Sequence, residues 1–170
     1  VSIIDVYKHQ DKVIEAVIQM RKDRFPIELH MVGGSYQPAL DKIQYDIDAN
    51  STFIKYHGFQ PYDSLHKFYK SADLFIFASS CENMPNILIE AMASGLPIAS
   101  SDKGPMKEFL LDGGSYFDPC DSSSIEDCLI TMINNPVSRK EKALKAIGYA
   151  SQYNWNKCAK ETFTFLEQIG

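Results

Sequence analysis

The sequence lacks the patterns that mark several large classes of protein. No apolar run approaches the roughly 20 residues that a membrane-spanning helix needs. The four cysteines show neither the C-x-x-C spacing nor the neighbouring histidines of a zinc site. Positive charge is also scarce, because 17 lysines and arginines face 22 aspartates and glutamates, a formal net charge of -5. These absences argue against a nucleic-acid partner held by bulk electrostatics and favour a reduced, cytoplasmic protein.

Motifs of common α/β enzymes are missing as well. The Gly33-Gly34 pair is not part of a G-x-G-x-x-G fingerprint, which disfavours a nicotinamide enzyme, and no G-x-S-x-G nucleophile motif occurs. The aspartates of the Asp-Ile-Asp stretch at 46–48 lie in a polar helical pattern and are interpreted as a solvated helix face. Since no other spacing of His, Cys, Asp or Glu suggests ligands, we expect no metal and no cofactor.

What the sequence does contain is a regular alternation of strand and helix patterns. Short apolar runs typical of buried strands cover 2–5, 27–32, 52–57, 73–78, 97–100 and 115–117. Helical patterns cover 9–22, 38–50, a stretch from about 63, 85–95, about 124–134, 138–150 and 155–168. This alternation predicts an α/β fold, a doubly wound, Rossmann-like parallel sheet of about six strands with helices on both faces.

Particular residues indicate where some helices begin and end. Asp63 is expected to be the N-cap of its helix, and Ser123 with Glu126 forms the S-x-x-E pattern of a capping box. Pro85 suits the first turn of a helix and Gly95 suits its end.

The loops after the predicted strands share a distinctive composition. Ligands of doubly wound sheets bind outside the carboxyl ends of the strands. Lys8, Gly33-Gly34, Gly58-Phe59, the segment 79–86 and the segment 100–104 all follow strands. We therefore expect glycines, small polar residues, one lysine and one glutamate at one edge of the sheet.

Two glutamates stand on either side of a predicted helix start, in the run SCENMPNILIEAM at 81–93. A loop glutamate is usually only solvated, but Glu82 sits at the rim of the expected cleft, where it could accept hydrogen bonds from a sugar. Glu90 lies among apolar helical neighbours and is either on an exposed stripe or held for a ligand. A carboxylate can accept one hydrogen bond from each of two vicinal ribose hydroxyls.

Between the glutamates, the expected helix start has phosphate-binding potential. If the helix begins near Pro85, the amides of Asn86, Ile87 and Leu88 point outward without partners and attract anions. An ordinary helix that begins at proline is the alternative. Lys8 could neutralise a diphosphate at the same edge, although a lone lysine is usually solvent-exposed.

The run SCENMPNILIEAMASGLPIASSD resembles the signature of the retaining glycosyltransferases of family 4, also called group 1. The resemblance covers nearly the whole chain, from the opening strand and Lys8 through MVGG, IKYHGF and GLPIAS to a final helix with a tryptophan. It implies one half of a GT-B fold, in which two Rossmann-like domains enclose a cleft. Residues 1–170 would then be the nucleotide-sugar (donor) binding domain, the C-terminal half of a longer enzyme. The apolar opening at Val1 also leads us to expect a preceding domain.

The resemblance implies a role for each matching residue. Glu82 would be catalytic and contact the donor sugar near the reacting centre, while Glu90 would bind the ribose hydroxyls. The remaining donor-binding residues would hold the phosphates and line the nucleotide: Lys8, Gly33, Gly34, Gly58, Phe59, Met84, Pro85, Asn86 and Ile87. One position departs from the family, because Ile3 stands where many members carry a diphosphate-binding arginine, so Lys8 stands without that partner.

The implied function is retaining transfer of a hexose from a UDP- or GDP-linked sugar to a glycan or lipid-linked acceptor, as in polysaccharide or lipopolysaccharide biosynthesis. The acceptor would bind the N-terminal domain, so we expect the isolated chain to bind donor but transfer little. The expected location is the cytoplasm, with peripheral association of the full-length protein at the inner face of the membrane. The alternatives are a GT-B-type nucleotide-sugar epimerase and an inactive nucleotide-binding or interaction module.

The final helix carries a wide apolar face that includes Phe163, Phe165, Leu166 and Ile169. In GT-B enzymes the C-terminal helix often crosses to pack on the N-terminal domain. We therefore expect part of this face to be exposed in the present chain.

Overall fold

Five short parallel strands form the centre of the protein in the computed structural model, which describes residues 1–169. They are β1 (Leu29–Met31), β2 (Ile54–Tyr56), β3 (Phe75–Phe77), β4 (Ile98–Ser101) and β5 (Ser115–Phe117). They pair as two parallel ladders, β1-β2 and β3-β4-β5. The predicted parallel α/β architecture is confirmed, with five strands rather than about six.

The expected opening strand at 2–5 is the one that does not form. Ile4 makes an isolated parallel bridge with Ser35, and backbone hydrogen bonds join Ser2 to Val32 and Ile4 to Gly34. The Asp5 side chain accepts a hydrogen bond from the Val6 amide and starts the 3-10 turn η1 (Val6–Lys8). The turn at Val6 therefore limits the pairing of this segment to a single bridge.

The helices alternate with the strands as the apolar pattern predicts. Their bounds are α1 (Gln10–Lys22), α2 (Gln37–Ala49), α3 (Tyr62–Ser71), α4 (Asn86–Ala93), α5 (Met106–Leu110), α6 (Ser122–Asn134), α7 (Pro136–Ala150) and α8 (Trp155–Ile169). Only α5 and η1 were not predicted, because each is too short to show a periodicity.

Two predicted helix caps are wrong in detail. Helix α3 begins at Tyr62, so Asp63 lies inside its first turn and Pro61 occupies the N-cap position. Helix α6 is capped by Asp121, whose side chain accepts from the Ser123 amide at 2.9 Å. A cap that lies nearer to the strand end thus replaces the expected capping box.

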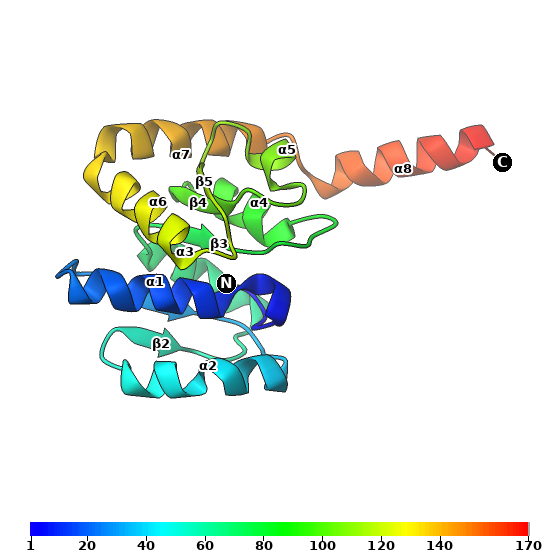
Figure 1. Ribbon diagram of the computed structural model, residues 1–170. Coiled ribbons are helices and arrows are strands. Elements are labelled where there is room, and N and C mark those ends of the chain that lie inside the picture. Colours follow the sequence, from blue (N-terminus) through cyan, green and yellow to red (C-terminus); the bar gives the residue numbers. More distant parts are fainter. Residues whose placement is uncertain (170) are drawn as a thin grey trace.

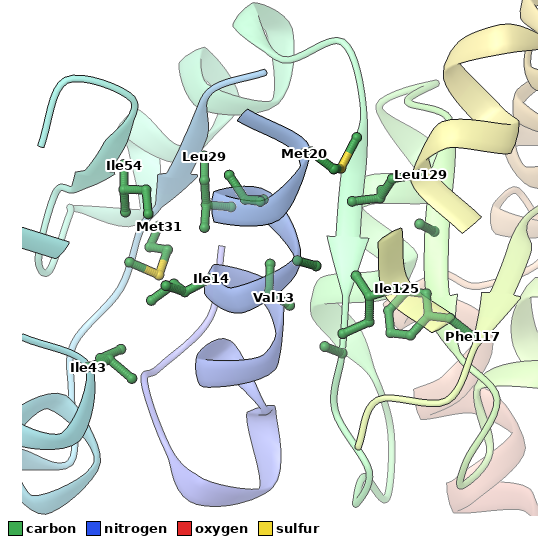
Figure 2. Close-up of a cluster of buried hydrophobic side chains, with 14 of the residues drawn as sticks. Val13, Ile14, Met20, Leu29, Met31, Ile43, Ile54, Phe117, Ile125 and Leu129 are labelled. Atoms are coloured by element: carbon green, nitrogen blue, oxygen red, sulfur yellow. The ribbon is translucent and has the colours of Figure 1, made fainter. Parts of the chain in front are cut away.

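Helices cover both faces of the strands, and each face has its own core. On one face, apolar side chains of α1, α2 and α6 pack together with β1, β2 and Phe117 of β5 (Figure 2). On the other face, α4, α5 and α7 pack against Phe75, Phe77 and Ile98. Ala99 belongs to the first core and its neighbour Ile98 to the second, because successive strand residues point to opposite faces.

The last helix, α8, projects away from the rest of the molecule (Figure 1). None of its residues is buried. The expected exposure of its apolar face is confirmed, since Phe163 is 65% exposed and Ile169 66%. Within residues 1–169, none of the helices is both long and apolar enough to cross a membrane.

Candidate functional site

Lys8 and Glu82 form an ion pair between η1 and the loop that follows β3. The Lys8 Nζ contacts Glu82 Oε1, and the two side chains are only 7% and 16% exposed. Two aromatic rings surround the same ammonium group, with the centroid of Tyr7 at 5.1 Å and that of Phe77 at 5.4 Å. Both charged residues were predicted at this edge of the sheet. Lys8 was expected to be solvent-exposed unless it met a ligand.

Hydrogen bonds between the two loops bring this pair together. The Ser80 amide donates to the Tyr7 carbonyl oxygen at 2.9 Å, and His9 Nε2 lies 2.8 Å from the Ser80 hydroxyl. His9 has a φ of 49°, a left-handed conformation that turns the chain from η1 into α1. The backbone of η1 is thus attached to the loop after β3, which fixes Lys8 opposite Glu82.

Glu90, on α4, is held by a different residue. The buried Tyr69 of α3 donates its phenolic hydrogen to Glu90 Oε2 at 3.0 Å. Burial and the neighbouring Glu90 charge raise the pKa of Tyr69, so the phenol stays protonated and remains a donor. The pair leaves Glu90 Oε1 available to a ligand and links α3 to α4.

Tyr69 was not predicted as a site residue. Its position on the apolar stripe of α3, with Leu65 and Phe68, indicated a core residue. A signal was nevertheless present, because a buried tyrosine usually finds a hydrogen-bond partner for its hydroxyl.

The start of α4 differs from the expectation in one amide. The Asn86 amide donates to the Met84 carbonyl oxygen at 2.9 Å, so it is not free. Pro85 is buried before the helix, and its carbonyl oxygen accepts from Ile89 at 3.1 Å. Among the hydrogen bonds of residues 1–169, none satisfies the amides of Ile87 and Leu88. These two amides retain the anion-binding potential of a helix N-terminus.

The glycine loops after β1 and β2 also meet. The Gly33 amide donates to the Gly58 carbonyl oxygen at 2.9 Å, and the Tyr56 hydroxyl donates to the Gly33 carbonyl oxygen at 3.1 Å. Gly34 is half-buried beside them, and the Phe59 side chain is 79% exposed. Phe59 is therefore free to contact a ligand.

A separate hollow lies between β1 and β3. Its lining comes from the strands and the segments beside them: Val1, Ser2, Ile4, Lys8, Gln10, Val13, Leu29, His30, Met31, Ile76, Phe77, Ala78 and Ser79. Lys8 is the one predicted site residue in this lining. The hollow therefore adjoins the surface formed by the two glutamates and the start of α4 at Lys8, which pairs with Glu82.

Within residues 1–169, no group of three or more His, Cys, Asp and Glu side chains is arranged to hold a metal ion. The site as it stands can offer one buried ammonium group, two carboxylates with separate partners, and the amides of a helix start. Such groups suit a ligand that carries phosphates and hydroxyls.

Comparison with known proteins identifies relatives of this chain. The family model described as "Glycosyl transferases group 1" matches residues 1–152. The lipopolysaccharide 1,2-N-acetylglucosaminetransferase of Salmonella typhimurium is 33% identical over 169 residues, which cover 92% of this chain and 43% of that protein. The O-antigen chain mannosyltransferase B of Escherichia coli is 26% identical over 110 residues, which cover 65% of this chain and 29% of that protein. The chain thus spans less than half the length of these relatives.

Solved structures share the fold. A glycosyltransferase from Rickettsia africae matches with a TM-score of 0.87 and 16% identity, over 99% of this chain and 46% of that one. Anabaena Alr3699/HepE in complex with UDP matches with a TM-score of 0.85 and 21% identity, over 98% of this chain and 47% of that one. At this level of identity the likeness establishes the fold, which is that of about half of a GT-B glycosyltransferase.

Proposed function

The chain belongs to the group 1 glycosyl transferases, and from that premise we propose that it is the donor-binding domain of a retaining hexosyltransferase. It would hold a nucleotide diphosphate sugar, while a glycan or lipid-linked acceptor would bind an N-terminal domain. The observation that carries the proposal is the Lys8–Glu82 pair beside the start of α4. Names of relatives support it, since one acts in lipopolysaccharide assembly and one was solved with UDP and glucose.

Each part of the donor would meet a different group of the site. Glu90 Oε1 would accept hydrogen bonds from the ribose, because Tyr69 already occupies Oε2. The amides of Ile87 and Leu88 would face the diphosphate at the helix N-terminus. Glu82 would accept hydrogen bonds from the sugar, and the loops with Gly33, Gly34, Gly58 and Phe59 would line the nucleotide.

The chemistry would depend on stabilising the charge of the leaving diphosphate. As the bond to the sugar breaks, negative charge grows on the diphosphate and an oxocarbenium-like centre develops at the sugar. Lys8 and the amides at the start of α4 would stabilise that charge, so the transfer would need no metal. The nucleoside diphosphate would then leave, and the sugar would be joined to the acceptor with retained configuration.

Without its acceptor domain, the chain would bind donor but transfer little. We place the whole enzyme in the cytoplasm, in peripheral contact with the membrane where lipid-linked glycans are assembled. The Salmonella and Escherichia relatives, by their names, act on lipopolysaccharide and O-antigen, which supports this location.

Calorimetric titration of the chain with UDP, GDP, ADP and their sugar conjugates tests the proposal. We expect one nucleotide to bind, and Lys8→Met to weaken it by at least about tenfold, as the loss of a charge-assisted contact predicts. The matched control is Lys12→Met, because Lys12 is partly exposed and forms an ion pair with its helical neighbour Glu15. Binding of no nucleotide would favour the inactive module. Consumption of a nucleotide sugar without acceptor would favour the epimerase.

A further inference from the structure

The surroundings of Lys8 restrict how an anion can reach it. The side chain is 7% exposed, and the rings of Tyr7 and Phe77 both lie close to its ammonium group. Glu82 is its one ion-pair partner among residues 1–169. A buried ammonium group needs such a counter-ion, because an isolated charge is costly away from water. A diphosphate that binds Lys8 must therefore displace Glu82 or share the ammonium group with it.

The two partners differ in how firmly the chain holds them. Lys8 ends η1, whose backbone is bonded to Ser80, and its side chain is enclosed by the rings. Glu82 lies in the loop between Ser80 and Met84, both of which have backbone hydrogen bonds. Within residues 1–169, the backbone groups of Glu82 and Asn83 make no such bond. Glu82 is therefore the less firmly held member of the pair.

We propose that Glu82 is a specificity-determining residue that makes the site favour an intact nucleotide sugar over the bare nucleoside diphosphate. This inference rests on the proposed function. A nucleotide sugar offers hydroxyl donors to Glu82 when the carboxylate leaves Lys8, so the exchange leaves no charge without a partner. A bare nucleoside diphosphate lacks the sugar hydroxyls that would reach Glu82, so the Glu82 carboxylate stays beside Lys8 and repels the phosphates.

The same exchange has a consequence for turnover. Transfer removes the sugar from the diphosphate. The hydroxyls that donated hydrogen bonds to Glu82 are removed with it. Glu82 then competes again for Lys8 and helps to release the product. The ion pair of the free protein is, in this view, the state to which the site returns after each transfer.

Glu82→Gln tests the inference, with titrations of the bare diphosphate and its sugar conjugate into the protein that contains this chain. The neutral amide cannot neutralise Lys8, so the bare diphosphate should bind on the order of tenfold more tightly. The conjugate should bind equally or more weakly, so the preference for the conjugate falls. Glu15→Gln is the matched control, because it removes the charge from the partly exposed Lys12–Glu15 pair and should change neither affinity.

The double variant Lys8→Met/Glu82→Gln separates the proposed cause from others. If Glu82 acts through Lys8, Glu82→Gln should give no gain for the bare diphosphate in the Lys8→Met background. Unchanged or weaker binding of the bare diphosphate to Glu82→Gln overturns the inference. If that variant does not fold, titration of the wild-type protein alone still tests the inference. A wild-type preference for the bare diphosphate is incompatible with the inference. A wild-type protein that binds neither ligand refutes the proposed function itself.

Discussion

Tyr69 determines how the second carboxylate of the site is presented. Its hydroxyl occupies Glu90 Oε2 and orients the side chain, while Oε1 stays available. Lys8 has the corresponding relation to Glu82 at the other side of the start of α4. Each glutamate therefore has one protein partner, and the partners differ in kind: a neutral phenol for Glu90 and a cation for Glu82. We expect the two carboxylates to respond differently to a ligand.

Glu90→Gln should weaken the bare nucleoside diphosphate. The change preserves size but removes the charge from two ribose hydrogen bonds, so we expect a loss of roughly 1–3 kcal/mol. That loss is about tenfold to a hundredfold in affinity. Tyr69→Phe should cost less, because Glu90 keeps its charge and loses only one orienting bond. Calorimetric titration with the nucleotide measures both effects.

The 2'-deoxy nucleotide provides the control for Glu90. It lacks one of the two hydroxyls, so Glu90→Gln should weaken it less than it weakens the ribonucleotide. Equal losses with both nucleotides would mean that Glu90 does not contact the ribose.

The positions of the site residues could be predicted from the sequence, but their partners could not. Lys8, Glu82 and Glu90 could be placed at one edge, because strand ends and a helix start are visible in the apolar pattern. Their partners could not, because the Lys8–Glu82 pair depends on the long-range bond between Tyr7 and Ser80. Contacts between loops leave no periodic trace in a sequence.

At the scale of elements, long periodic segments were predicted well and short ones poorly. Helices α1, α2, α6, α7 and α8 run over 13 to 15 residues and show several turns of apolar periodicity. Helix α5 has 5 residues and η1 has 3, less than two turns, so neither shows a period. The strand predicted at 2–5 is wrong for the opposite reason. Its apolar residues match a strand, but the turn that begins at Val6 leaves no room for a longer one.

Gly33→Ala should destabilise the connection after β1. Gly33 has a φ of 140°, and an added Cβ would lie 2.2 Å from the Ser2 carbonyl oxygen, so backbone must move. We expect a cost on the order of 1–3 kcal/mol in the free energy of unfolding. Urea denaturation followed by circular dichroism measures it.

Gly34→Ala is the matched control for that substitution. An added Cβ at Gly34 meets no atom within 4 Å, so the free energy of unfolding should change little, by about 0.5 kcal/mol or less. If both variants unfold at the same urea concentration, the close approach of Gly33 to Ser2 does not constrain the fold.

At the scale of the whole molecule, α8 differs from every other helix. Each of the other α-helices buries at least one residue, whereas α8 buries none. Its large apolar residues are exposed, among them Trp155 at 79% and Phe163 at 65%. Figure 1 shows that its direction carries it away from both cores. An exposed apolar helix face of this kind marks a surface that another surface covers.

We expect the N-terminal domain of the proposed two-domain enzyme to cover α8. Each large apolar side chain buried there would contribute roughly 1.5–3 kcal/mol, so Phe163→Ser with Leu166→Ser should lower the unfolding temperature of the full-length protein by several degrees. The same pair of substitutions in the isolated chain should leave that temperature unchanged, since both side chains are already exposed there. Lys160→Ser on the same helix is the control and should affect neither protein. Differential scanning calorimetry of the two forms makes the comparison. Equal shifts in the isolated chain and the full-length protein would show that α8 stays uncovered in both.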